Sequence, residues 1–493
     1  MSRPRNIVFI FSDQHNPKFT GYEGHVFVQT PHLDRLVEQG VSFNAAYTPN
    51  PICVPARHAM LSGTYTRNNC VYLNNAIPPI SLPSFARYLS EQGWRTCLVG
   101  KGHFHGRKED SKLKAYVYRG YQERLYGDLL GTGHQSYPFR GANPELEGAG
   151  SGHGNHAIGG TFTLAGPSGI PEFQESEHQV TSEAIKWLQV HRATQRDRPF
   201  LLSVHYPKPH FPWQPPRRWF EAYREIARGQ VRTYSEAEMQ DRLPVHQTAW
   251  NHYLGFGATQ EDLDRGLAGY AGNVSYLDEM IGHLMASMEY MGYLKDTLII
   301  YASDHGDMAG AHGLWHKQLF YEESARVPLI FSGPGVAEGE RRDPVVSLVD
   351  LFPTLCDVAG LEIPNHCDGL SLAPLLEAPG ELPDRLVFSE IVFQGPHWRG
   401  AMVRHGPWKY CWYVGDQEEL YHLDEDPLED VNLVGDPDVG PVQQRLREAL
   451  LDWWQPDDLE RRIQLLPKTT KEDRHFWPFQ HVLPENRWVD AYP

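Results

Sequence analysis

Five short apolar, β-branched runs constrain the fold of this chain more than any other feature. They are Asn6–Phe11, Arg95–Val99, Phe200–Val204, Leu298–Ala302 and Val327–Phe331. Continuous apolar character over such a run is typical of a strand buried on both faces of a parallel sheet. Helical stretches lie between the runs, at His32–Gln39, Leu82–Gln92, Gln179–His191, Gly266–Met291 and Val346–Ala359. Strands that alternate with helices predict an α/β fold with helices on both faces of a mostly parallel sheet.

Polar side chains follow four of these strands at the point where each strand ends. The segments are Ser12–His15, Gly100–His103, His205–His210 and Ser303–Gly306. All four are rich in Asp, His or Lys, and ligands bind at the carboxyl ends of strands in such sheets. We therefore expect the functional site at this edge of the sheet.

The sequence pattern changes after about residue 385. Short strands separated by turn residues, at Gly400–Arg404, Trp408–Val414 and Leu420–Leu423, predict a small antiparallel sheet. We therefore predict a catalytic α/β domain over residues 1–384 and a C-terminal antiparallel-sheet subdomain with a tail over residues 385–493. Two stretches, 104–175 and 206–262, are predicted to be long loops that shape the substrate pocket.

Composition and charge exclude several classes of protein. The chain has 45 Lys+Arg against 62 Asp+Glu, and a formal net charge of −17 argues against a binding surface for nucleic acid or anionic lipid. No run reaches about 18 apolar residues, and no cleavage region follows the first apolar run, so neither a membrane span nor a signal peptide is expected. Six cysteines in 493 residues do not form a disulfide framework. These observations predict a soluble cytoplasmic protein.

The motif Cys53-Val54-Pro55-Ala56-Arg57 carries the strongest chemical signal in the chain. Pro55 suits the first turn of a helix, which would place Cys53 at the positive helix end with Arg57 one turn further on the same face. A helix N-terminus and an arginine activate a thiol and bind anions. The residues alone predict a nucleophile beside an oxyanion site, with a buried structural Cys53 as the alternative.

This motif resembles the sulfatase signature, in which the cysteine is converted after translation to formylglycine. Further segments resemble motifs of that family in the same order, namely Asp13 after the first strand, Gly100–His103, Ser303–Asp307, Gly313–Lys317 and Leu420–Leu433. The resemblance runs from about residue 6 to residue 433. It implies an alkaline-phosphatase-like α/β/α sandwich with a mostly parallel central sheet, plus a small C-terminal α+β domain with an antiparallel sheet.

The resemblance implies a site for one divalent metal ion, Ca²⁺ in preference to Mn²⁺. Its implied ligands are Asp13, Gln14, Asp304 and His305, and the hydroxyl made from Cys53 would complete the shell. A hard cation held by carboxylate oxygens polarises the anionic oxygens of a sulfate or phosphate ester.

The resemblance also implies catalytic roles. Fixed positive charge for the transferred group would come from Arg57, Lys101 and Lys317. His103 would deprotonate the second hydroxyl of the formylglycine hydrate and so expel sulfate. His210 would assist the leaving alcohol together with Lys317. Asn74 matches an asparagine that contacts the substrate in related enzymes.

Two positions depart from the commonest sulfatase pattern. Many relatives have Asp-Asp after the first strand and Asp-Asn at the later metal motif, where this chain has Asp13-Gln14 and Asp304-His305. These choices resemble the branch that contains choline sulfatases and phosphonate monoester hydrolases. The catalytic core therefore leaves sulfate and phosphonate or phosphate esters open as substrates.

Two other protein classes remain as alternatives. A cysteine-dependent phosphatase would need its arginine further along the chain than Arg57 stands from Cys53, and it would leave the metal motifs unexplained. A catalytically dead binding protein with a sulfatase fold disagrees with the intact motif residues.

We therefore predict a metal-dependent sulfuric ester hydrolase that cleaves a small or aryl sulfate monoester, with a phosphonate monoester hydrolase or phosphodiesterase as the alternative. The expected partners are the ester and a formylglycine-generating or equivalent maturation enzyme, with no nucleic acid and no membrane. The tail His475–Pro493 holds several aromatics and prolines. It resembles tails that cross to a neighbouring subunit in this branch, so we expect a homo-oligomer, either a dimer or a tetramer.

Overall fold

The computed structural model of the protein describes residues 4–74, 76, 78, 81–104, 119–127, 165–254, 258–380, 382–392, 398–415 and 417–459. Most of the predicted loop 104–175, and the whole tail His475–Pro493, lie outside these residues. In the described part of the chain, no helix combines the length and the apolar character needed to cross a membrane.

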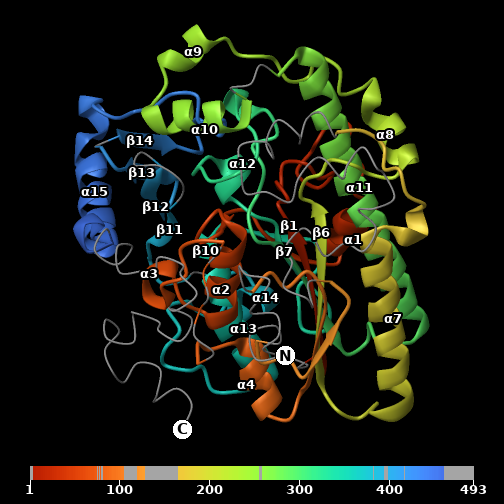
Figure 1. Ribbon diagram of the computed structural model, residues 1–493. Coiled ribbons are helices and arrows are strands. Elements are labelled where there is room, and N and C mark those ends of the chain that lie inside the picture. The colour runs from red at the N-terminus through yellow and green to blue at the C-terminus, as the bar shows by residue number, and fades with distance from the viewer. Residues whose placement is uncertain are drawn as a thin grey trace, which may run out of the picture.

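Eight described strands form the central sheet, in the order β5-β4-β6-β1-β7-β8-β2-β9 (Figure 1). Their bounds are β1 Asn6–Asp13, β2 Gly40–Phe43, β4 Arg95–Gly100, β5 Glu123–Leu125, β6 Phe200–Pro209, β7 Thr297–Ser303, β8 Leu329–Ser332 and β9 Glu340–Arg342. Strand β1 lies between β6 and β7 and runs parallel to both. The stretch Ile7–Phe11 is at most 1% exposed, because both faces of the sheet are covered. The predicted α/β fold with a mostly parallel sheet is confirmed.

The direction predicted for one strand is wrong. The run Val327–Phe331, predicted to be a parallel strand, forms β8 and pairs antiparallel with both β7 and β2. All of β8 is buried, as its apolar sequence indicates. Continuous apolar character reports burial on two faces and does not report strand direction, so the sequence could not distinguish the two pairings.

The side chains of β1 alternate between two helical layers. Ile7, Phe9 and Phe11 belong to a core shared with one layer, and Val8 and Ile10 belong to a core shared with the other. The first layer consists of α2 (Cys53–Ser62), α4 (Phe85–Glu91), α13 (Leu351–Ala359) and α14 (Ala373–Glu377). The second consists of α1 (Pro31–Glu38), α7 (Ser176–Thr194) and α11 (Gln260–Tyr290), at the right of Figure 1. The sheet is therefore the middle layer of an α/β/α sandwich.

The predicted helix Val346–Ala359 begins later than expected. Its first two residues form β10 (Val346–Ser347), which pairs with β3 (Ala46–Tyr47), and α13 begins only at Leu351. Ser347 and Asp350 form a capping box across the short helical turn η7 (Leu348–Asp350). The signal for a helix start therefore lies at Ser347 rather than at Val346.

A second sheet of four antiparallel strands follows, in the order β11-β12-β13-β14. Its strands are β11 Val387–Val392, β12 Arg399–His405, β13 Trp408–Tyr413 and β14 Gln417–His422. Helix α15 (Gly440–Trp454) packs on it through Leu446, Leu450 and Trp454. The predicted C-terminal antiparallel sheet is confirmed, with β11 as an additional strand. The division of the chain between residues 384 and 385 stays a prediction.

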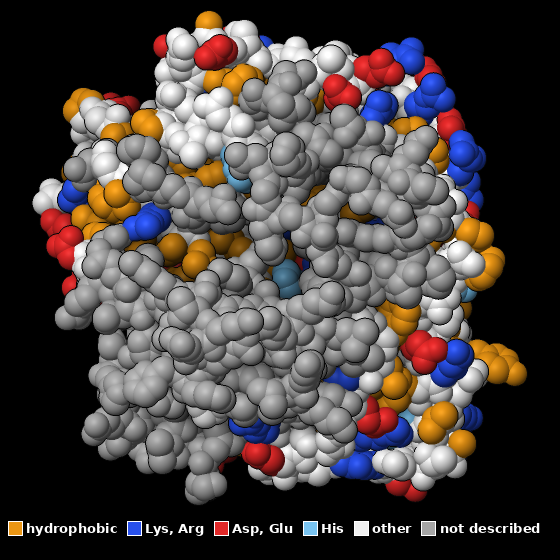
Figure 2. All heavy atoms as spheres, viewed as in Figure 1, with side chains coloured by type: hydrophobic (Ala, Val, Ile, Leu, Met, Phe, Trp, Pro, Cys, Tyr) orange, Lys and Arg blue, Asp and Glu red, His pale blue; other side chains and the backbone are white. Residues whose placement is uncertain are grey.

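The stretch 206–262 is more regular than its composition predicts. After β6 it forms α8 (Arg217–Arg224), α9 (Glu236–Gln240) and α10 (Pro244–Leu254). Helix α8 buries Phe220 and Tyr223 and turns its charged side chains outward, at the upper right of Figure 2. Ser235 caps α9 in a capping box with Glu238. Helices α8 and α9 span too few turns for their apolar periodicity to be recognised in a Pro- and Arg-rich segment.

The remaining described helical segments are short connections. They are α3 (Thr66–Asn69), α12 (Glu322–Ala325), η5 (Glu172–Gln174), η6 (Ala311–Gly313) and η8 (Pro437–Val439).

Candidate active site

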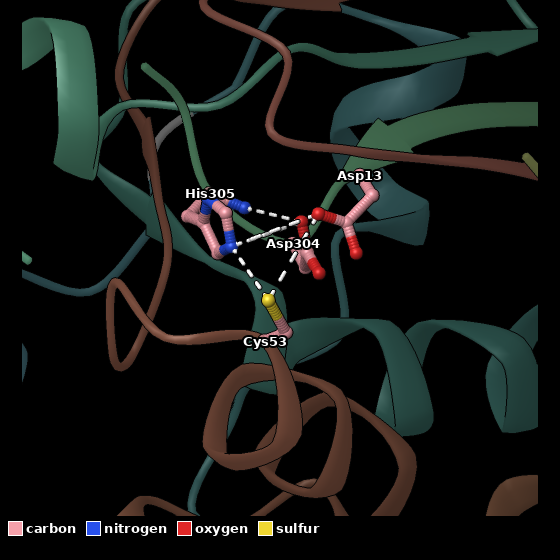
Figure 3. A group of neighbouring side chains, drawn as sticks. All are labelled: Asp13, Cys53, Asp304 and His305. Atoms are coloured by element: carbon pink, nitrogen blue, oxygen red, sulfur yellow. Dashed lines mark hydrogen bonds and ion pairs between the residues drawn. The ribbon is translucent and has the colours of Figure 1, made fainter. Parts of the chain in front are cut away.

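Two strand ends and one helix start converge at the carboxyl edge of the sheet. Asp13 is the last residue of β1, and Asp304 and His305 directly follow β7. Because Ser12 pairs with Ser303, the residues that follow them lie side by side. Cys53 begins α2, a helix whose ten residues are all buried, and its sulfur points toward both carboxylates and the imidazole (Figure 3).

The donor atoms of Asp13, Cys53, Asp304 and His305 form one compact, buried group. They all lie within 4.8 Å of one another. The Cys53 Sγ atom lies 3.2 Å from His305 Nε2 and 3.9 Å from Asp13 Oδ1. His305 Nδ1 lies 3.0 Å from the Gly306 carbonyl oxygen, so its N–H donates there and the lone pair of Nε2 faces the group. Two carboxylates and an imidazole nitrogen are a donor set that fits a divalent cation.

Two cationic side chains hold the carboxylates in place. Arg57 donates from Nε to Asp304 Oδ2 and from Nη2 to Asp13 Oδ2, each at 2.9 Å. Lys101 Nζ lies 2.6 Å from Asp13 Oδ2. The Arg57 side chain is completely buried, so these charge-assisted bonds form out of contact with water. Arg57 therefore bridges the end of β1 and the segment after β7.

The two carboxyl groups differ in their affinity for a proton. Burial opposes ionisation of Asp13, but nearby cations, Lys101 first among them, hold its pKa well below the ordinary value. Burial and the neighbouring Asp13 carboxylate raise the pKa of Asp304 to about 6. Burial also lowers the pKa of His305 to about 4, so its ring is neutral at pH 7 and can act as a ligand.

Lys317 connects the Cys53 thiol to a buried polar chain. Its Nζ atom lies 3.5 Å from Cys53 Sγ and donates to Gln14 Oε1 at 2.6 Å. Gln14 Nε2 donates in turn to Asp307 Oδ2, and Asp307 Oδ1 accepts two backbone N–H groups. Asp307 is the last residue of the motif segment Ser303–Asp307, but no role was predicted for it. The oxygen of Gln14 faces Lys317, and its predicted role as a metal ligand stays a prediction.

The other predicted site residues lie around this centre. His210 Nε2 is 3.8 Å from Asp13 Oδ1, and the His210 backbone N–H donates to the Asp13 carbonyl oxygen. His103 is buried just beyond the end of β4. Asn74 Oδ1 accepts a hydrogen bond from the backbone N–H of Val54, in the first turn of α2. The structure gives Asn74 a place at this helix end, and its contact with substrate stays a prediction.

Comparison with known proteins identifies the family. Residues 5–361, well over half of the chain, match the family model described as "Sulfatase". The chain belongs to the sulfatase family. A second model, described as "N-sulphoglucosamine sulphohydrolase, C-terminal", matches residues 310–455 of this sulfatase.

Relatives of this sulfatase match it over most of its length. It is 32% identical over 459 residues to the choline-sulfatase of Rhizobium meliloti, covering 91% of this chain and 85% of the relative. It is 27% identical over 459 residues to an arylsulfatase of Clostridium perfringens, covering 90% and 93%. Among solved structures, the phosphonate monoester hydrolase of Agrobacterium radiobacter has a TM-score of 0.73 at 25% identity, covering 91% of this chain and 95% of that chain. The predicted sulfuric ester hydrolase is confirmed.

Family membership accounts for the composition of the buried group. Sulfatases generally use a formylglycine and a divalent metal ion, and the cluster of Asp13, Cys53, Asp304 and His305 is compatible with both. A cysteine-dependent phosphatase is not supported, because it would leave unexplained the candidate metal ligands Asp13, Asp304 and His305 around Cys53.

Proposed function

We propose that this sulfatase hydrolyses a small or aryl sulfate monoester with a formylglycine made from Cys53 as its nucleophile. The position of the Cys53 sulfur carries this proposal. It lies 3.2 Å from a candidate metal ligand, His305 Nε2, and 3.5 Å from the ammonium group of Lys317. An oxygen at this point would lie beside the Lys317 ammonium and beside any cation that His305 helps to hold, and both would activate it.

The side chains around Cys53 suit the steps of such a reaction. A hydroxyl of the aldehyde hydrate attacks sulfur, and nearby positive charge from Arg57 and Lys101 stabilises the sulfate oxygens. As the bond from sulfur to the alcohol oxygen breaks, His210 gives that oxygen a proton, and the Lys317 ammonium stabilises the negative charge that develops on it. His103 then takes the proton of the remaining hydroxyl, the carbon–oxygen bond to sulfate breaks, and the aldehyde is restored.

The donor group would hold one divalent cation through Asp13, Asp304 and His305. Its charge would polarise the sulfate oxygens. Ca²⁺ is the first candidate from family resemblance, whereas the nitrogen of His305 favours Mn²⁺, because Ca²⁺ prefers ligands that are all oxygen.

Metal binding is expected to stabilise the folded protein. A cation at about 100 times its Kd raises the free energy of unfolding by about 2.7 kcal/mol, because it binds the folded state alone. Thermal unfolding in chelated buffer, with Ca²⁺ or Mn²⁺ titrated in, measures the effect. Asp304→Asn should weaken binding at least about tenfold and reduce the shift.

The matched control for this titration is Asp278→Asn. Asp278 is also a buried carboxylate, but it accepts backbone N–H groups at the start of α1. Its variant should keep the full metal-dependent shift. Equal shifts in the wild type and in Asp304→Asn would contradict the assigned donor group.

Removing the imidazole of His210 should slow the hydrolysis of sulfate esters of weakly acidic alcohols most. His210→Ala is expected to lower kcat for phenyl sulfate by about 10²-fold, since a general acid contributes most when the leaving group is basic. For para-nitrophenyl sulfate the loss should stay below about tenfold. His191→Gln, which alters a buried histidine on α7 that contacts Tyr293 and the Arg198 carbonyl, is the control. A uniform loss on both esters would argue against the acid role.

Phosphonate monoester hydrolysis is the second candidate. Sulfate monoesters and phosphonate monoesters both present one negative charge on a tetrahedral group, so the charges of this site accept either. The similarity to the Agrobacterium phosphonate monoester hydrolase supports this candidate.

A substrate panel tests the proposal directly. It compares para-nitrophenyl sulfate, choline sulfate, a phenylphosphonate monoester and bis(para-nitrophenyl) phosphate, each with Ca²⁺ and with Mn²⁺. A kcat/KM for one of the sulfates at least about tenfold above the phosphonate supports the proposal. The reverse order would favour the second candidate.

A further inference from the structure

The backbone on both sides of Lys317 adopts a conformation that few residues tolerate. His316 has φ = 66° and Gln318 has φ = 72°, so two residues with a Cβ lie in the left-handed region. Such residues persist there only when surrounding contacts hold them. On the side of the sheet, the His316 backbone N–H donates to Asp307 Oδ1, and the His316 carbonyl accepts the N–H of Met308.

The contacts on the other side come from outside the central sheet and its two helical layers. The indole N–H of Trp398, just before β12, donates to the Gln318 carbonyl oxygen at 2.6 Å. The Tyr253 hydroxyl, on α10, donates to Gln318 Oε1. Lys409 Nζ, on β13, donates to the Phe320 carbonyl at 2.7 Å. All three donors are buried, so each bond forms where water does not compete.

Lys409 is itself fixed by two carboxylates. Its Nζ lies 2.9 Å from Glu322 Oε1, at the start of α12, and also pairs with Glu429, which follows β14. Helix α10 is joined to the same sheet, because the Val245 N–H donates to Gln417 Oε1 at 2.8 Å. Figure 1 shows α10 and α12 beside the blue C-terminal strands. Residues of α10 and of the C-terminal sheet therefore hold the segment 318–322, directly after Lys317, through several buried hydrogen bonds and ion pairs.

We propose that Trp398, Tyr253 and Lys409 are positioning residues that hold Lys317 against the Cys53 position. This inference rests on the role proposed for Lys317 above. The Lys317 ammonium lies at the end of a flexible side chain, where it contacts Cys53 Sγ and Gln14 Oε1. The position of the ammonium therefore depends on the position of the Lys317 backbone. Small displacements of a reacting group reduce rate steeply. The C-terminal sheet and α10 would thus act on the reaction through the backbone next to Lys317.

Trp398→Phe tests this inference, because it removes the N–H donor and keeps an aromatic ring. We expect kcat for phenyl sulfate to fall about tenfold, with KM changed by less than about twofold. The loss on para-nitrophenyl sulfate should stay below about threefold, since a good leaving group needs less help from Lys317. In a Lys317→Ala background the substitution should have no further effect on kcat.

Matched variants separate positioning from stability. Trp454→Phe removes the indole N–H that donates to Glu390 at 3.2 Å, and it should leave the ratio of the two kcat values unchanged. Tyr253→Phe repeats the test at a residue of α10. Its control is Tyr410→Phe, which removes a hydroxyl that donates to Glu418. Tyr253→Phe decides the matter if Trp398→Phe does not fold.

Two outcomes have different meanings. If Lys317→Ala alone leaves kcat for phenyl sulfate unchanged, the role proposed for Lys317 is wrong, and the positioning inference fails with it. If Lys317→Ala is strongly impaired but Trp398→Phe and Tyr253→Phe lower kcat equally in both backgrounds and on both esters, positioning alone is overturned. The proposed function then stands.

Discussion

Cys53→Ala lowers kcat for sulfate esters by at least about 10⁴-fold, because no atom remains that can become the nucleophile. The substitution removes one buried sulfur, which lies 3.2 Å from His305 Nε2 and 3.5 Å from Lys317 Nζ, and leaves both neighbours in place. Steady-state kinetics with para-nitrophenyl sulfate measure the loss. Intact mass should show that active wild-type protein in its aldehyde form is about 18 Da lighter than the encoded chain.

Cys53→Ser distinguishes the formylglycine from a simple oxygen nucleophile. Serine keeps one hydroxyl at this position but has no second hydroxyl from which a proton can be taken to expel sulfate. We expect at most one turnover per molecule, visible as a small burst without a steady state. Cys356→Ala, at a buried cysteine in α13, is the control and should retain full turnover. Sustained turnover by Cys53→Ser would rule out the proposed nucleophile.

Arg57→Met destabilises the metal-free protein by about 3–5 kcal/mol, the second large effect that we expect. Arg57 makes two 2.9 Å hydrogen bonds, one to each of two completely buried carboxylates. Methionine fills similar space but leaves Asp13 and Asp304 without this partner, and one uncompensated buried charge costs several kcal/mol. Urea unfolding in chelated buffer measures the change.

Arg218→Met is the matched control, because Arg218 also makes a two-point contact with a carboxylate. Its Nε and Nη2 lie 2.9 and 3.1 Å from Glu172, but the Arg218 and Glu172 side chains are 46% and 43% exposed. Arg218 also pairs with Glu279, and each such exposed ion pair contributes less than about 1 kcal/mol. If the two variants lost equal stability, the ion pairs of Arg57 would stabilise the fold no more than a surface ion pair does, and the expected large effect would be wrong. Arg57→Lys should recover only part of the loss, since an ammonium group cannot make the forked contact.

The sequence predicted the sheet and its site edge because both follow from local patterns. Continuous apolar runs identified the core strands, and the polar residues after them met at one edge because parallel strands end there together. Strand direction was not predictable for β8, since burial on both faces is the same in either direction. Helices α8 and α9 were missed because so few turns give little periodicity.

The sequence predicted which residues belong to the site better than it predicted the contacts between them. Gln14 was predicted as a metal ligand from the resemblance to the sulfatase family, and in the structure its amide is oriented by Lys317 and Asp307. Those partners are 303 and 293 residues away along the chain, and only the folded structure brings them to Gln14. The left-handed backbone at Gln318 depends in the same way on a distant residue, Trp398. No local pattern reports such contacts.

The burial of Lys409 between Glu322 and Glu429 has an evolutionary consequence. Loss of Lys409 would take this cation from two buried carboxylates at once, so we expect a change at Lys409 to require changes at Glu322 and Glu429 as well. Recombination that replaced Lys409 together with the C-terminal strands would leave Glu322 without this partner unless Glu322 were exchanged with them. The crossover point would then lie upstream of α12, well before the first strand of the exchanged sheet. For such an exchange, the ion pairs of Lys409, rather than the end of a sheet, would set the boundary of the segment.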